Sequence, residues 1–312
     1  MNFKKLYILA FLFVSAGLYA QTTYNSSQWS RYLVSQNVAY AGYYDYLTAG
    51  IIHRSQWVGW NNAPSWQDLE IQSPLKSDGN AISFTYGHED FPTKFQSHKL
   101  NLGYTHIIKM SSFKTAFGLG LGINYHTNNL LETRDPEDPA FMDEKQSYLI
   151  PQATLGIAFY NEKFHAGLSI PEFFGVKTNE SGEFSPDMNF SDILFRITGG
   201  YKYSVSTGTF NVDLSSNALV KYQMTGVMQI DVNTIGVIND AIIAGLGFRV
   251  VESAYLVLGY QLNKQFSVAY SYDFVVGALR STKALEGIQG SHMIGLVYNL
   301  NYLVNTANPR PF

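Results

Sequence analysis

Short segments in which apolar and polar residues alternate run along most of this chain. In the segment Phe113–Tyr125, Phe117 and Leu119 stand at odd positions and Gly118 and Gly120 at even positions. Successive side chains of a β-strand point to opposite faces. Each such segment therefore predicts a strand with one apolar, aromatic face and one small or polar face. These windows do not show the period of 3.6 residues that a helix requires.

The sequence contains about fourteen alternating segments, which is enough for one large sheet. They span approximately 46–56, 64–74, 80–88, 95–109, 113–126, 147–160, 163–170, 193–205, 209–221, 224–235, 240–251, 254–262, 265–275 and 289–303. An even number of antiparallel strands closes into a barrel with both chain ends on one side. We expect an all-β fold, a transmembrane antiparallel β-barrel of about 14 strands between residues 45 and 303.

The connections between these segments alternate in length. Short turns follow the even-numbered segments, at 76–79, 111–112, 161–162, 206–208 and 263–264. All the long connections follow odd-numbered segments, at 57–63, 89–94, 128–146, 171–192 and 277–289. Outer-membrane barrels have short periplasmic turns and longer external loops. The pattern predicts that 128–146 and 171–192 are exposed on the cell surface and that the N-terminus is periplasmic.

Composition favours a membrane barrel over a soluble sheet. Aromatic residues make up 15% of the chain and charged residues 14%, whereas soluble domains carry about 25% charged residues. A mean hydropathy of −0.07 suits strands with one side in lipid and the other in a polar lumen. The soluble alternatives are a large β-sandwich and a propeller, but the sequence has no repeat of the length of a propeller blade.

The first twenty residues predict a cleaved secretory signal peptide. Lys4 and Lys5 precede an apolar stretch, Leu6–Val14, and small residues lead to Ala20. No Cys follows, so a lipoprotein anchor and a disulfide framework are excluded. We expect export to a Gram-negative outer membrane. The expected division is a signal peptide at 1–20, an N-terminal periplasmic or plug-like segment at 21–44, the barrel at 45–303 and a tail at 304–312.

The sequence contains none of the common motifs of enzymes or metal sites. It has no HExxH, no Gly-x-Ser-x-Gly and no phosphate-binding Gly-x-x-x-x-Gly-Lys. We therefore expect a non-enzymatic protein without a cofactor or metal site, although Ser97 or Ser267 could still pair with His106 or His292 across strands. The net charge changes from −3 to −5 once two signal-peptide lysines are removed, which argues against binding to nucleic acid.

Several features allow two interpretations each. Gly118, Gly120 and Gly122 share the non-lipid face, where they either bend the strand or leave room for Tyr24–Ala41 inside the barrel. The carboxylates of Glu132–Glu144 favour a solvated external loop, with a calcium site as the alternative.

A pair of tryptophans and an arginine lie near the end of the first predicted strand. Trp57 and Trp60 indicate an interfacial aromatic belt or an anchor for a partner. If Arg54 points inward, it requires an acidic partner in the lumen.

Short motifs are spread over most of the mature chain and are densest between residues 37 and 75. They are Asn37-Val38-Ala39-Tyr40-Ala41-Gly42, Arg54-Ser55-Gln56-Trp57-Val58-Gly59-Trp60, Ala63-Pro64, Ser73-Pro74-Leu75, the acidic Asp135–Phe141 and the end Asn308–Phe312. Together these motifs resemble those of one family, the PorP/SprF outer-membrane proteins of Bacteroidetes. Val38 departs from the pattern, because the family usually has proline there.

The resemblance implies an accessory barrel of the type IX secretion system. Such barrels support secretion or cell-surface attachment of large cargo proteins, including gliding adhesins. The implied partners are outer-membrane lipid, other components of the secretion system and secreted cargo. The rival hypotheses are a passive porin or hydrophobic-solute transporter and, less favoured, a barrel enzyme.

The family motifs supply a set of candidate structural or partner-binding residues. They are Asn37, Ala39, Tyr40, Ala41, Gly42, Arg54, Gln56, Trp57, Gly59, Pro64 and Pro74. Their polar and aromatic side chains can fix the N-terminal segment against the first strand by hydrogen bonds and ring packing.

Overall fold

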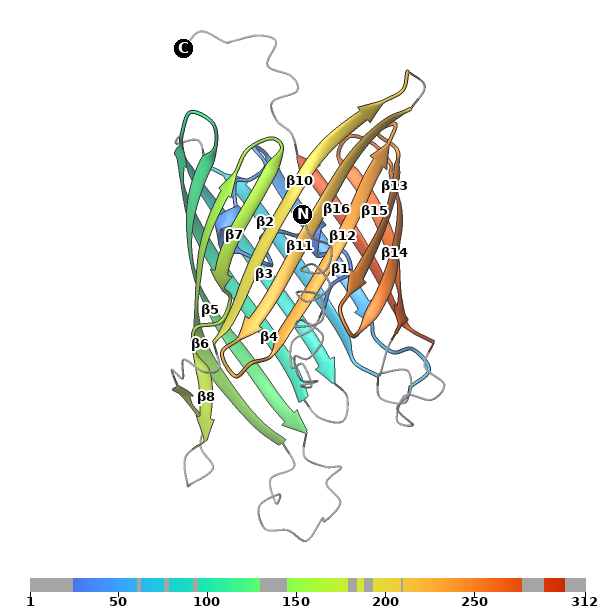
Figure 1. The fold of residues 1–312 in the computed structure, drawn as a ribbon. Helices are drawn as coiled ribbons and strands as arrows, with labels where there is room; N and C mark the ends of the chain where they lie inside the picture. Colours follow the sequence, from blue (N-terminus) through green and yellow to red (C-terminus); the bar gives the residue numbers. More distant parts are fainter. Residues whose placement is uncertain are drawn as a thin grey trace, which may run out of the picture.

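The chain folds into one closed β-barrel (Figure 1). The computed structural model describes residues 25–60, 63–75, 79–91, 95–129, 145–178, 184–187, 193–208, 210–276 and 289–300. Fourteen antiparallel strands make up the barrel wall in these residues, which confirms the predicted fold class. The predicted signal peptide, the acidic segment 132–144 and the tail 304–312 lie outside the described residues.

Each barrel strand lies close to one of the alternating segments. The strands are β1 (Leu47–Ser55), β2 (Ser65–Pro74), β3 (Asn80–Phe91), β4 (Phe95–Lys109), β5 (Lys114–Asn129), β6 (Lys145–Tyr160), β7 (Phe164–Ile170), β10 (Leu194–Ser206), β11 (Asn211–Gln223), β12 (Met228–Ile238), β13 (Ile242–Arg249), β14 (Ser253–Gln261), β15 (Phe266–Val275) and β16 (Ser291–Leu300). Each strand pairs with the next barrel strand, and β1 closes the barrel by pairing with β16.

A short hairpin lies in the connection between β7 and β10. β8 (Gly175–Thr178) pairs with β9 (Phe184–Asp187) in a separate two-stranded sheet. The connection-length pattern predicts only a loop at 171–192, without this hairpin. Strands of 4 residues are too short to show an alternation that can be told from chance.

The two faces of the wall differ in the way that the alternation predicts. On β5, Leu119 and Leu121 point outward and are 49% and 65% exposed. Asn124 points into the barrel and is buried, and Lys114 forms an ion pair of 3.2 Å with Asp45. Apolar side chains therefore cover the outer surface, as a barrel that spans a membrane requires.

The two ends of the barrel differ in the length of their connections. Turns such as 110–113 and 161–163 join strands at one end, which we call the short-turn end. The connections 56–64, 130–144 and 276–290 join strands at the opposite, long-loop end. The distribution agrees with the alternation of short and long connections in the sequence.

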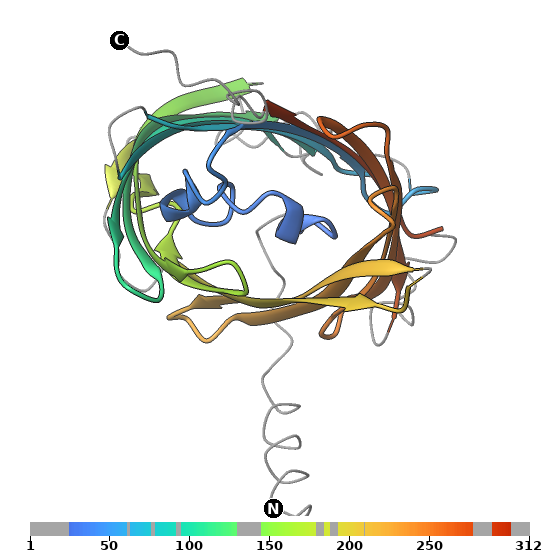
Figure 2. The same cartoon turned by 90° about the horizontal axis from the view of Figure 1, so that it is seen from above.

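The chain before β1 passes through the inside of the barrel (Figure 2). We call residues 25–46 the lumenal segment; it contains two 3-10 helices, η1 (Trp29–Arg31) and η2 (Val38–Tyr40). It begins near Glu252 in the β13–β14 turn at the long-loop end, and it reaches Tyr160 at the short-turn end. The segment thus runs along the lumen instead of lying below the barrel in the periplasm. Among the described residues, no helix is long and apolar enough to cross a membrane.

Candidate functional site

A group of charged side chains lies inside the barrel near its long-loop end. Arg54 Nη1 is 2.8 Å from Asp273 Oδ2, and Arg249 Nε is 2.9 Å from Asp231 Oδ2. Arg249 also pairs with Glu252 at 2.9 Å and with Asp273 at 3.4 Å. We call these five residues the lumenal ion cluster. Asp273 is the acidic partner that Arg54 was expected to require.

Each acid of the lumenal ion cluster also binds the lumenal segment. Asn25 Nδ2 donates to Glu252 Oε2 at 2.8 Å. Ser27 Oγ donates to Asp273 Oδ1 at 2.5 Å. Trp29 Nε1 donates to Asp231 Oδ1 at 3.0 Å. Charged acceptors form the stronger hydrogen bonds, so the first residues of the segment are fixed to β12, β15 and the β13–β14 turn. 

The Asn37–Gly42 stretch is fixed to the opposite side of the wall. Asn37 Nδ2 donates to the carbonyl oxygens of Ile157 at 3.0 Å and Leu168 at 3.3 Å, while its Oδ1 accepts from Ala39 N at 2.9 Å. The asparagine thus caps η2 and binds β6 and β7 at once. Val38 is the first residue of η2, a position that suits proline because its N–H needs no partner in the helix. The departure from the family pattern therefore leaves this turn intact.

Tyr40 continues the contact toward the short-turn end. Its hydroxyl lies 2.8 Å from Thr198 Oγ1 on β10 and 3.0 Å from His165 Nδ1 on β7. Tyr43 packs edge-on against Tyr40, and the Lys202 Nζ atom lies 4.8 Å from the centre of its ring. Burial raises the pKa of Tyr43 to about 12, so the ring stays neutral.

Glycines on the strands make room for the lumenal segment. A Cβ atom at Gly118 would lie 2.6 Å from Ala39 N, and one at Gly167 would lie 2.7 Å from Asn37 Nδ2. Both distances are too short for real atoms, so these positions require glycine while the segment is in place. At Gly120 a Cβ would instead meet the side chain of Asn101 in the wall itself. Room for an inserted segment therefore explains Gly118, and packing within the wall explains Gly120.

The two alanines and the glycine of the Asn37–Gly42 stretch are also held in place by close packing. Ala39 and Ala41 are fully buried. Gly42 has a φ of +78°, which disfavours other residues. Its N–H donates to Gln72 Oε1 on β2 at 2.7 Å. Gly42 therefore turns the chain from the lumen toward β1.

The second family motif divides between the lumen and the long-loop end. Arg54 faces the lumen, whereas Gln56 N donates to the carbonyl oxygen of Pro64 at 2.9 Å in the β1–β2 connection. Trp57 N donates to Ser291 Oγ on β16 at 3.1 Å. Gly59 has a φ of +97°, which allows the tight turn there.

The aromatic rings of this connection pack on one another, and the last motif residue ends a strand. The rings of Trp57 and Trp60 lie 5.6 Å apart, and Trp60 packs edge-on against Phe91 of β3. Pro74 is the last residue of β2. The structure therefore brings only part of the predicted set together.

The expectation that the motif residues hold the N-terminal segment against the first strand is wrong for most of them. Asn37 and Tyr40 bind β6, β7 and β10, and Gln56 and Trp57 contact neighbouring connections and β16. Among the described motif residues, the Arg54 side chain joins β1 to the segment, through Ser27 Oγ at 3.3 Å. Tyr32, which lies outside the motifs, also donates to the carbonyl oxygen of Ile51 on β1 at 3.4 Å. The prediction fails because the path of the segment through the lumen, which the motifs do not indicate, brings Asn37 and Tyr40 to β6 and β7.

The Ser and His residues considered for catalysis are not paired. Ser97 is buried in the lumen and donates to Asn124, whereas His106 lies on the outer face with Asn80. Ser267 is likewise inside the barrel and accepts from Arg31, whereas His292 contacts Tyr270 outside. The strand alternation itself places these residues on opposite faces. No cluster of metal-ligating side chains occurs among the residues that the structure describes.

Sequence reasoning missed the acids and the arginine of the late strands. Asp231, Arg249 and Asp273 each stand at an inward position of an alternating strand. A charged residue on the small or polar face of such a strand is the signal that could have identified them.

Comparison with known proteins adds to this geometry. The model of the family described as "Type IX secretion system membrane protein PorP/SprF" matches residues 18–298. None of the curated proteins compared with the chain is a significant match.

Solved structures similar to this chain are barrels of low sequence identity. The Omp33 outer membrane protein of Acinetobacter baumannii is 9% identical, with 82% of this chain and 99% of that one covered and a TM-score of 0.45. The CymD monoaromatic hydrocarbon channel is 9% identical, with 91% and 95% covered and a TM-score of 0.47. The KdgM porin is 11% identical, with 81% and 99% covered and a TM-score of 0.40. On its sequence match over residues 18–298, the chain belongs to the PorP/SprF family of type IX secretion system membrane proteins, and it forms a barrel of the outer membrane.

Proposed function

We propose that this protein is an accessory barrel that supports secretion or cell-surface attachment of large cargo proteins by the type IX secretion system. Cargo of this kind includes the adhesins used in gliding. Family membership supports the link to the secretion system. The barrel then acts through the proteins it binds, without catalysing a reaction.

The observation that carries the proposal is the lumenal segment. It is bound at one end by the lumenal ion cluster and at the other by Thr198 and His165. Barrels with an interior filled by their own chain are plugged, in contrast to the open channels of porins. A plugged barrel is suited to present its rims to other proteins.

The rival proposals lack such support. A passive porin or a transporter of hydrophobic solutes requires a continuous path through the lumen, and the lumenal segment occupies part of that interior (Figure 2). A barrel enzyme requires a nucleophile and a base on the same face, whereas Ser97 and His106 are on opposite faces of β4.

A deletion experiment in the host tests the proposal. The gene is removed and then restored, and the proteins of the cell surface and the medium are quantified by mass spectrometry. The proposal predicts that a defined set of large cargo proteins is lost from the surface and returns with the restored gene. Other outer-membrane proteins, which serve as the internal control, should stay constant.

The opposite outcome would favour a transporter. If cargo proteins are unchanged and the uptake of a small solute falls instead, the secretion role is wrong.

A second experiment extracts the tagged barrel in a mild detergent. Recovery of known secretion components beyond their level in an untagged extract supports the role, and their absence from all such extracts counts against it.

A further inference from the structure

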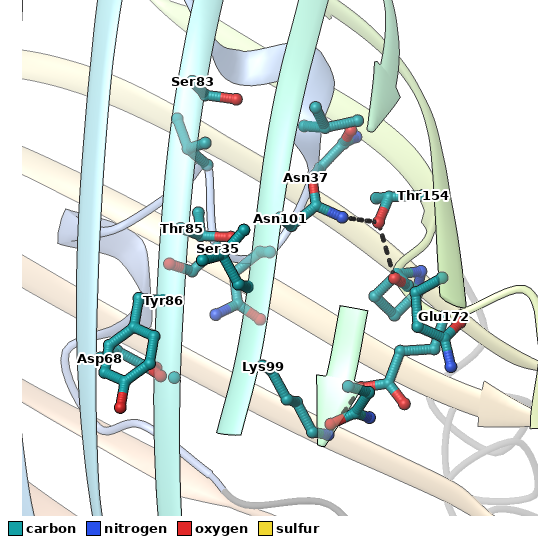
Figure 3. A pocket seen from close by; sticks show the side chains of 18 of the residues that line it. Ser35, Asn37, Asp68, Ser83, Thr85, Tyr86, Lys99, Asn101, Thr154 and Glu172 are labelled. Carbon is teal, nitrogen blue, oxygen red and sulfur yellow. Dashed lines mark hydrogen bonds and ion pairs between the residues drawn. The ribbon is translucent and has the colours of Figure 1, made fainter. Parts of the chain in front are cut away.

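A polar cavity of about 100 Å³ lies between the lumenal segment and the wall (Figure 3). Ser35 and Asn37 line it from the segment, and Lys99, Asn101 and Thr154 line it from β4 and β6. A single water needs only about 10–15 Å³ of such space. The cavity is therefore large enough for a small polar group in addition to water.

The chain that follows β7 folds over this cavity. Thr154 Oγ1 donates to the carbonyl oxygen of Pro171 at 2.8 Å, and Asn101 Nδ2 donates to the same Thr154 hydroxyl at 2.6 Å. Gln152 exchanges two hydrogen bonds with the backbone of Phe174, at 2.7 Å and 3.2 Å. These bonds hold Glu172 at the edge of the cavity, where it is visible beside Lys99 in Figure 3.

The cavity opens toward the long-loop end. Lys99 and Glu172 form an ion pair of 2.7 Å, and their side chains remain 31% and 40% exposed. Lys99 is near the start of β4, and Glu172 directly follows the end of β7, both at the long-loop end. A ligand from that side can reach the pair before it reaches the buried residues behind it.

Arg196 of β10 lies deeper in the same cavity and has an unused donor. The residue is only 8% exposed. Its Nη1 donates to the carbonyl oxygen of Ser35 at 2.8 Å, but among the described residues its buried Nε has no hydrogen-bond partner. A buried charged donor without an acceptor is unfavourable. Nε itself is fully buried, so an acceptor that enters the cavity would meet the positive charge of Arg196 at the part of the side chain that lines the cavity.

We propose that this cavity is a binding site for a single carboxylate group that enters from the long-loop end. The guanidinium of Arg196 and the ammonium of Lys99 supply the positive charge, and arginine suits a planar carboxylate. Asp68 and Glu172 line the same cavity and disfavour ligands with two negative charges, such as phosphate. The carboxylate is the end of a peptide or a small free acid. The inference goes beyond the secretion role and does not depend on it.

The test uses the purified full-length barrel in detergent and ligand-observed NMR. The probes are acetyl-triglycine, its C-terminal amide and acetate. The site predicts that acetyl-triglycine binds. The affinity of its amide should be lower by a factor of about ten or more, which is the effect of one lost charged hydrogen bond. Tighter binding of the peptide than of acetate identifies a peptide end, and equal binding identifies a free acid. Equal affinity for acetyl-triglycine and its amide, or no binding of either carboxylate, overturns the proposal.

Three variants locate the site. Arg196→Gln should weaken the binding of acetyl-triglycine about tenfold or more. Glu172→Gln should strengthen it, because Lys99 loses its competing partner. Lys163→Gln, in the exposed turn at the opposite end, is the matched control and should leave binding unchanged.

The fold of each variant is checked by a heat-modifiable gel shift, which separates folded from unfolded barrels. Folded Arg196→Gln with unchanged affinity overturns the proposal. If Arg196→Gln does not fold, Glu172→Gln decides, since loss of folding cannot produce tighter binding. An unchanged or weaker affinity in Glu172→Gln then overturns the proposal.

Discussion

Arg54 and Asp273 form a buried ion pair of 2.8 Å between two strands that are not neighbours. β16 lies between β1 and β15, so the pair crosses the seam where the barrel closes. Ser27 Oγ bonds both side chains. The pair therefore connects β1, β15 and the lumenal segment.

Arg54→Ala should destabilise the barrel strongly. Removal of one partner of a buried ion pair costs about 3–5 kcal/mol when the other charge is left uncompensated. Arg249 lies 3.4 Å from Asp273 and compensates part of its charge, so we expect a loss toward the lower end of that range. The control is Lys114→Ala, because the Lys114–Asp45 pair is partly exposed and such pairs contribute about 0–1 kcal/mol. Urea unfolding in detergent measures both variants. Equal urea midpoints for the two variants would show that the Arg54–Asp273 pair does not stabilise the closed barrel.

Gly118→Val should displace the lumenal segment while leaving the wall closed. The added side chain occupies the space of the Ala39 backbone, and overpacking of this kind costs about 1–3 kcal/mol. Gly199→Val is the control, because nothing lies within 3.4 Å of the Cβ position there. Limited proteolysis of the folded barrels should cut the 25–46 region faster in Gly118→Val only. Equal rates in both variants would contradict the close approach at Gly118.

Tyr40→Phe should weaken the attachment of the segment at the short-turn end. The change removes the hydroxyl that contacts Thr198 and His165 and takes this partner from the buried Nδ1 atom of His165, at a cost of about 1–3 kcal/mol. The outward-facing Tyr104 binds Asn80 and is 48% exposed. Tyr104→Phe is therefore a control with a smaller expected cost. The midpoint temperature of thermal unfolding should be lower for Tyr40→Phe than for Tyr104→Phe. The reverse order would show that the buried hydroxyl does not hold the segment.

The orientation of the barrel can be tested with cysteine labels, since the chain has no natural Cys. Ser181→Cys lies in the 171–192 connection and should react with a membrane-impermeant maleimide on intact cells. Ser77→Cys lies in a short turn and should react only after the cells are opened. Labelling of Ser77→Cys alone in intact cells would reverse the orientation.

Local patterns in the sequence were enough to predict the wall of the barrel. All fourteen strands lie near the predicted segments because alternation depends only on neighbouring residues. The partners of the lumenal segment could not be predicted in this way. Ser27 and Asp273 are 246 positions apart, and a sequence pattern does not say which strands face each other across a closed barrel.

For the family motifs, too, the sequence indicated which residues matter but not which strands they contact. The sequence singled out Asn37, Tyr40 and Arg54, and all three hold the lumenal segment in place. It placed the first two against the wrong strands, because their contacts with β6, β7 and β10 depend on the path of the segment through the lumen. The hairpin of β8 and β9 was missed because it is too short to carry a pattern.

Conductance in a planar lipid bilayer tests the central claim, that the barrel is plugged by its own N-terminal segment and serves secretion instead of solute passage. The purified wild-type barrel should insert without a steady open-channel current, and Gly118→Val, with its segment displaced, should show channel openings. Gly199→Val should behave like the wild type. A stable open-channel current from the wild-type barrel, at the level of an open porin, would contradict the account.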